Sequence, residues 1–79
     1  MYRGSSYYFE SCVKSDTADN SCDGIRNGDA VAGDIKVQFN NGKDFTFGNV
    51  QPGEKIPGHI KLIYNTGTAV TAVEKMFLF

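Results

Sequence analysis

The stretch that decides the fold is GDIKVQFNNGKDFTF, residues 33–47. Apolar side chains occupy every second position in both of its halves, and this spacing is the period of a β-strand. The polar segment between the halves, Asn40-Asn41-Gly42, is typical of a tight turn. The stretch therefore predicts two antiparallel strands joined by a short loop.

The loop length follows from the side chains that each register brings together. A two-residue loop at Asn41-Gly42 places Phe45 opposite Gln38, which mixes an apolar and a polar face. A three-residue loop with Gly42 in the left-handed conformation pairs Val37 with Phe45 and Ile35 with Phe47, and one face is then wholly apolar. We predict this register, with a bulge at Gly42.

The remaining chain also shows period-2 alternation, and no segment has helical spacing of apolar residues. Further strands are expected around residues 7–13, 30–32, 59–65 and 69–79. A type II turn is expected at Pro52-Gly53, since proline and glycine suit its two central positions. The sequence predicts an all-β fold, a small antiparallel β-sandwich or barrel of about six or seven short strands. Residues 1–13 are assigned to an N-terminal arm and first strand, and residues 14–79 to a single small β domain.

Residues 14–24, KSDTADNSCDG, carry almost no apolar side chain and are expected to form a surface loop. Asp16, Asp19, Asn20 and Asp23 offer oxygen atoms there, but the spacing does not match an EF-hand calcium loop. Ordinary turn chemistry, in which such side chains bond to nearby backbone, is the favoured explanation for these residues.

Size and charge limit the function classes. The chain has 79 residues with 8 basic and 9 acidic side chains, a net charge of -1. Without a basic stripe, duplex nucleic acid is not an expected partner. No apolar window is long enough to predict a membrane span, and the N-terminal residues lack the apolar core of a signal peptide. Synthesis in a cytoplasm is expected.

Motifs for catalysis or cofactor binding are missing from the sequence. His59 is the only histidine, and the sequence has no G-x-S-x-G nucleophile motif, no phosphate-binding glycine loop and no CxxC pair. We expect no catalytic residue, no cofactor and no metal. Cys12 and Cys22 are expected to be reduced in a cytoplasmic protein, although a disulfide between them would close a short loop.

Three tyrosines leave a binding role open. Tyr7, Tyr8 and Tyr64 could stack on single-stranded bases or on sugar rings, or they could fill the core.

The last residues, EKMFLF, raise a different question. Val73, Phe77 and Phe79 share one face of the predicted strand, and Met76 and Leu78 share the other. A strand that is apolar on both faces must be covered on both. Either the strand runs through the middle of a two-layer core, or a second subunit covers one face.

The order of short motifs along residues 13–73 resembles the small spike-base proteins of tailed phages and gene transfer agents. The matching elements are Ala32-Gly33-Asp34, Val37, Thr46-Phe47, Asn49-Val50, Gly53, Ile56-Pro57, Ile60-Lys61, Thr66-Gly67-Thr68 with Thr71, and upstream the segment SDTADN at residues 15–20.

This resemblance implies a non-enzymatic virion protein on the capsid exterior, acting as head decoration or as a spike base. It implies a homo-oligomer, threefold or fivefold, together with the major capsid protein and a spike or fibre protein as partners. We expect Val73, Met76, Phe77, Leu78 and Phe79 to form the self-contact. The loop residues Asp16, Asp19, Asn20 and Asp23 are expected to face the capsid shell.

Overall fold

The computed structural model describes residues 7–78, and these form six β-strands without a helix. The strands are β1 (Tyr7–Ser11), β2 (Cys22–Asn27), β3 (Gly33–Phe39), β4 (Asp44–Val50), β5 (Lys55–Ile63) and β6 (Val73–Leu78). All neighbouring strands are antiparallel, in the order β1-β6-β2-β5-β3-β4. The prediction of a small antiparallel all-β fold is confirmed.

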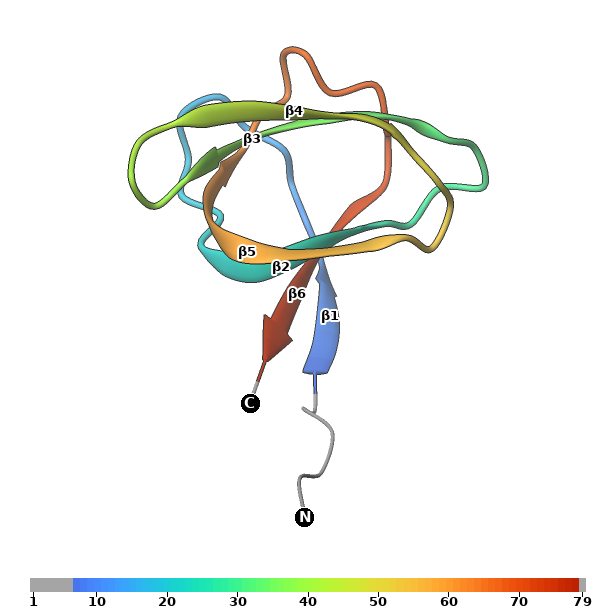
Figure 1. Cartoon of the computed structure of the whole chain (residues 1–79), viewed down its shortest axis with the longest axis horizontal. Coiled ribbons are helices and arrows are strands. Elements are labelled where there is room, and N and C mark those ends of the chain that lie inside the picture. Colours follow the sequence, from blue (N-terminus) through green and yellow to red (C-terminus); the bar gives the residue numbers. More distant parts are fainter. Residues whose placement is uncertain (1–6, 79) are drawn as a thin grey trace.

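The six strands belong to one sheet that curls over its own core (Figure 1). Strands β3 and β4 lie across the core from β2, and the long strand β5 connects the two regions. Strands β1 and β6 extend away from this body as a two-stranded arm, referred to below as the β1–β6 arm.

The hairpin of β3 and β4 has the predicted register. Val37 pairs with Phe45 and Ile35 with Phe47. The loop has three residues, since the Phe39 N–H donates to the Lys43 carbonyl at 2.8 Å, and Gly42 has a φ of 87°. Because the left-handed region is costly for residues with a Cβ, glycine at this position stabilises the turn.

The predicted turn at Pro52-Gly53 is also present. Gly53 has a φ of 77°, and the Glu54 N–H donates to the Gln51 carbonyl at 2.9 Å. This positive φ at the third position is the mark of a type II turn.

The core is aliphatic. Its fully buried side chains come from every strand from β2 to β6 and from the loop before β6, and the cluster is Cys22, Ile25, Ile35, Val37, Val50, Ile60, Ile63, Val70 and Val73. Cys12, Phe39, Phe47, Ile56 and Phe77 pack around it and are partly buried. Burial of these side chains provides most of the stabilising free energy, at roughly 25 cal/mol per Å² of apolar surface.

Several predicted boundaries are wrong. Residues 22–24 are not loop: they begin β2, and Cys22 and Gly24 are buried there. The expected strand at Ala30–Ala32 is a bend, because Asn27 and Asp29 direct this segment into side-chain hydrogen bonds. Strand β5 begins earlier, at Lys55, and includes Pro57 at a point where a register shift interrupts its pairing with β2.

Strand β6 starts at Val73 rather than at Ala69. Side-chain oxygens hold the segment before it: Asp29 accepts hydrogen bonds from the Thr71 N–H at 2.7 Å and the Ala72 N–H at 3.2 Å. These backbone groups are therefore engaged outside the ladder, and the strand begins only after them.

Candidate interaction surfaces

The chain itself covers much of the C-terminal strand. Strand β6 lies inside the sheet, between β1 and β2. Val73 is 1% exposed and belongs to the core, and Met76, on the opposite face, is 4% exposed. These two predicted interface residues are thus buried within their own chain, and neither has surface to offer a partner. Val73 and Met76 are therefore removed from the predicted self-contact, and only the residues at the end of β6 remain as candidates for it.

That end carries an exposed apolar surface. Leu78 is 45% exposed, and Phe77 is partly buried against the core. The Phe77 ring stacks on Tyr8 of β1, with ring centroids 5.3 Å apart, and Tyr8 is itself 45% exposed. Phe79 lies outside the described residues. The β1–β6 arm therefore exposes Tyr8 and part of Phe77 on one face and Leu78 on the opposite face.

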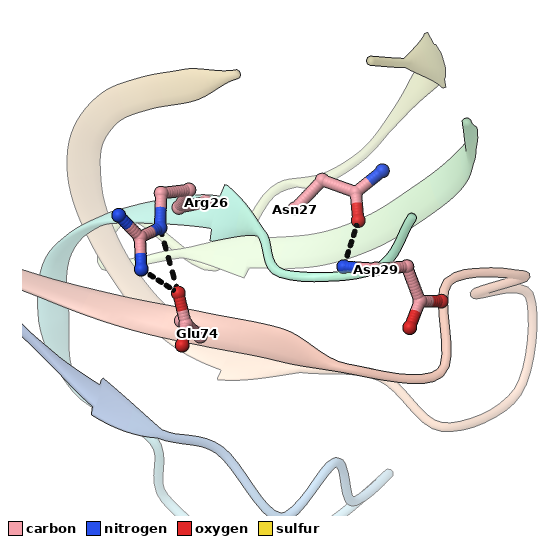
Figure 2. A network of polar contacts seen from close by, with 4 residues as sticks. All are labelled: Arg26, Asn27, Asp29 and Glu74. Carbon is pink, nitrogen blue, oxygen red and sulfur yellow. Dashed lines mark hydrogen bonds and ion pairs between the residues drawn. The ribbon is translucent and has the colours of Figure 1, made fainter. Parts of the chain in front are cut away.

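An ion pair and a cation–π contact tie the arm to the body. On the Arg26 side chain, Nε donates to the Glu74 Oε1 at 2.6 Å and Nη2 forms an ion pair with the same oxygen (Figure 2). The Arg26 guanidinium also lies 3.8 Å from the centroid of the Phe9 ring. Since Phe9, Glu74 and Arg26 come from β1, β6 and β2, these contacts connect three adjacent strands.

A buried asparagine organises the loops that follow these strands. Asn27 is 0% exposed, and its Nδ2 donates to the carbonyls of Val31 at 3.1 Å and Val50 at 2.8 Å. Its Oδ1 accepts from the Asp29 N–H at 2.7 Å, the contact shown in Figure 2. Both N–H groups of the amide and one of the two lone pairs of Oδ1 are thereby used. Asn27 therefore has a structural role.

The predicted capsid-facing residues have their polar groups engaged within the chain. The Asp16 carboxylate accepts hydrogen bonds from the Thr66 hydroxyl at 2.6 Å, the Thr66 N–H at 2.9 Å and the Asn65 N–H at 3.0 Å. These bonds, led by the one from the Thr66 hydroxyl, lower the pKa of Asp16. Asp19 accepts from the Ser21 hydroxyl and N–H, which lowers the pKa of Asp19 in the same way. The Asp16 carboxylate thus links the loop to Asn65 and Thr66, and the Asp19 carboxylate stabilises a local turn.

The other two residues of that set do not lie freely at the surface. Asn20 is only 7% exposed, and its Nδ2 donates to the Val13 carbonyl at 3.0 Å. Asp23 belongs to β2 and accepts from the Leu78 N–H at 2.8 Å. The sheet therefore uses these side chains to hold the loop and the end of β6.

The two thiols are free and protonated. Burial raises the pKa of Cys12 to about 11 and raises that of Cys22 as well. Thiolate, the reactive form, is thus disfavoured at both sites. Among residues 7–78, no three His, Cys, Asp or Glu side chains gather closely enough to hold a metal ion.

A shallow hollow of about 330 Å³ lies beside the β3–β4 hairpin, lined by Phe39, Asn40, Asn41 and His59. The His59 side chain is 83% exposed, and its Nδ1 is 3.9 Å from an Asp23 carboxylate oxygen. The hollow combines an aromatic ring with amide and imidazole groups.

The tyrosines considered for stacking have different surroundings. Tyr64 donates its hydroxyl to Asp44 at 2.7 Å, which raises the pKa of Tyr64, and the Lys36 Nζ lies 5.0 Å from its ring centroid. One face of Tyr64 is therefore occupied, while Tyr8 stacks on Phe77. The side chain of Tyr7 lies outside the described residues.

A further surface was not expected from the sequence: the edge strand β4. Phe45 is 51% exposed although its cross-strand neighbour Val37 is fully buried. The alternation correctly placed both on the apolar face. The exposure arises because the sheet ends at β4, and the order of strands is not readable from the alternation.

No family model, curated protein or solved structure matches the chain. In the described part of the chain, no helix is long and apolar enough to cross a membrane.

Proposed function

We propose that this chain is a non-enzymatic structural protein of a phage-like virion, attached to the capsid exterior as head decoration or as a spike base. The order of motifs along residues 13–73 supports this proposal, as does the small all-β fold. Its work is to bind, through one surface, other copies of itself and, through another, the major capsid protein or a spike.

The observation that carries the proposal is the apolar surface of the β1–β6 arm. The arm extends from the body (Figure 1), and it exposes Tyr8, stacked on Phe77, on one face and Leu78 on the other. Full burial of an exposed apolar side chain is favourable by about 1.5–3 kcal/mol, and because Leu78 is 45% exposed, covering it would contribute roughly half of that. Contacts between arms around a threefold or fivefold axis would cover them in a closed ring.

The loop of residues 14–21 is the proposed capsid-facing surface. Because the Asp16 and Asp19 carboxylates already accept hydrogen bonds within the chain, they hold the loop in one shape. The loop would meet the shell through that fixed shape and its exposed Thr17 and Ala18.

The test is the mass of the purified protein in solution, followed by its binding to purified phage-like heads. Leu78→Ser should lower the oligomer mass and reduce binding to the heads, because it removes exposed apolar surface from the arm. Val31→Ser is the matched control, since Val31 is 71% exposed but lies away from the arm. If Leu78→Ser and Val31→Ser have the same oligomer mass and bind the heads equally well, the role of the arm is contradicted. If the wild-type protein does not bind the heads, the proposed function is contradicted.

The hollow at the hairpin supports a second candidate function, carbohydrate binding. An aromatic ring can stack on the apolar face of a pyranose, and the groups of Asn40, Asn41 and His59 can bond to its hydroxyls. Titration with a glycan panel tests it. Saturable binding by a monomer that Phe39→Ala abolishes, together with no binding to heads, would favour this function over a virion role.

A further inference from the structure

Strand β4 ends the sheet and offers an open hydrogen-bonding edge. Among the described strands it pairs with β3 alone. The Phe39 N–H donates to the Lys43 carbonyl, and antiparallel ladders alternate, so Phe45 and Phe47 direct their backbone groups toward β3. The backbone groups of Asp44, Thr46 and Gly48 consequently point away from the sheet.

The side chains of β4 leave the apolar layer incomplete. Phe45 and Phe47 contact each other with ring centroids 4.8 Å apart, on the face that also carries the buried Ile35 and Val37. Phe45 is nevertheless 51% exposed, because no further strand follows. Edge strands usually resist pairing through lysine, proline or an inward charge. Residues 45–48, Phe-Thr-Phe-Gly, have none of these.

The sequence of this edge complements itself. Phe45-Thr46-Phe47 reads the same in both directions. If Thr46 lies opposite Thr46 of a second copy in an antiparallel pair, each Phe45 faces a Phe47, and each Asp44 faces a Gly48. No like charges then oppose each other, and the outward backbone groups of both copies meet. Such threonine and aromatic cross-strand pairs stabilise a sheet by about 0.2–1 kcal/mol each.

Neighbouring registers are less favourable. With Phe45 on the twofold axis, Phe47 would face Lys43, and with Phe47 on the axis, Phe45 would face Asn49. Only the register centred on Thr46 places a phenylalanine opposite every phenylalanine of the strand.

We propose that β4 pairs with β4 of a second copy of this chain, antiparallel and centred on Thr46, so that two sheets become one. The contact is isologous, so it closes after two copies and produces a dimer of this chain. It is independent of the function proposed above.

The experiment uses opposite charges at the centre of the pair. Thr46→Lys and Thr46→Glu each place two like charges directly opposite each other, so each variant alone should dimerise at least about tenfold more weakly than the wild type, a loss of about 1.4 kcal/mol. An equimolar mixture should restore the association. Sedimentation velocity over a concentration series measures both effects. Gln38→Lys and Gln38→Glu are the matched controls, because Gln38, opposite Asp44, lies on β3, which is paired on both sides and offers no open edge.

A backbone variant gives a second readout. Thr46→Pro removes an outward N–H that the chain's own ladder does not use, and proline is tolerated on edge strands in that orientation. It should abolish the association while circular dichroism stays that of the wild type. Should Thr46→Pro unfold, the charge mixture alone decides.

The proposal is overturned if the wild type shows no mass doubling, or if the mass is unchanged by both charged variants and by their mixture. A particle whose mass depends on Leu78 but not on Thr46 would also overturn it, and would leave the proposed function intact.

Discussion

Asn27→Ala is expected to be among the most destabilising substitutions in the protein. The side chain is 0% exposed and makes three hydrogen bonds, two donated from Nδ2 and one accepted by Oδ1. These bonds join the end of β2 to the segment 29–31 and to the end of β4. Alanine would remove all three and leave a small cavity.

The magnitude follows from where each bond lies. The bond to Val50 is buried, so its carbonyl would lose its partner out of reach of water, at a cost of about 1–3 kcal/mol. The bonds to Val31 and Asp29 are partly buried and contribute about 1 kcal/mol each. The sum is about 3–5 kcal/mol, against roughly 4–12 kcal/mol for the whole domain at typical values per residue. At about 4–8 °C for each kcal/mol in a domain of this size, the melting temperature should fall by about 12–40 °C.

The assay is thermal and urea unfolding followed by circular dichroism. Asn40→Ala is the control, because Asn40 is exposed on the hairpin loop, and its effect should stay within about 0.5 kcal/mol. Asn27→Asp keeps the accepting oxygen but directs a carboxylate at two carbonyls, so it should be no better than alanine. If the free energy of unfolding of Asn27→Ala is within about 1 kcal/mol of the wild-type value, the organising role given to this amide is wrong.

Two other predictions concern the packing of β2 and the buried thiol. In Gly24→Ala the new methyl would lie 2.5 Å from the Met76 Cε and 2.6 Å from a backbone carbonyl oxygen, which should cost at least about 1–3 kcal/mol in a urea titration. In Gly48→Ala the nearest atom to the new methyl would be 3.8 Å away, so this variant should have the urea midpoint of the wild type. Equal midpoints for Gly24→Ala and Gly48→Ala would refute the close packing described for Gly24. Burial raises the pKa of Cys12 from 9.0 to about 11, so the folded state keeps a proton that the unfolded state loses. The contribution of the Cys12 thiol to the free energy of unfolding should be fully present below pH 9 and be lost as the pH rises toward 11. Urea midpoints measured against pH under reducing conditions should therefore fall less steeply in Cys12→Ala than in the wild type. Equal slopes for the two proteins would argue against a buried thiol.

Local features of the fold were predictable from the sequence. The hairpin of residues 33–47 was predicted with its register, because alternation and one glycine determine it over a few residues. The type II turn at Pro52-Gly53 was predicted for the same reason.

Strand β2 was missed because its buried positions are not those of a typical apolar strand. Cys22, Gly24, Ile25 and Asn27 are buried, and a register shift between Cys22 and Gly24 breaks the alternation. Asn27 is polar but fully buried, and its burial is explained by its three hydrogen-bond partners. Val50 is distant in the sequence, and Val31 and Asp29 lie in a bend that the sequence did not indicate.

The candidate surfaces depend on the order of strands, which the sequence did not reveal. Met76 was expected at a subunit contact, but Gly24 lies opposite it and leaves space for its side chain. Phe45 was placed on the correct face, yet its exposure follows from the edge position of β4. Alternation predicts the face of a side chain, and only tertiary pairing determines whether that face is covered.

The central position of β6 has a consequence for synthesis on the ribosome. Strands β1 and β2 are translated first, but both pair with β6, which is translated last. The hairpin of β3 and β4 can form as soon as it emerges, and β2 can pair with β5, whereas β1 pairs with β6 alone and must wait for Val73–Leu78 to leave the exit tunnel. Pairings so distant along the chain form slowly, in milliseconds to seconds for comparable β topologies. The nascent chain therefore leaves β1 unpaired and one edge of β2 open until Leu78 has left the ribosome, and this interval is when chaperones would matter most.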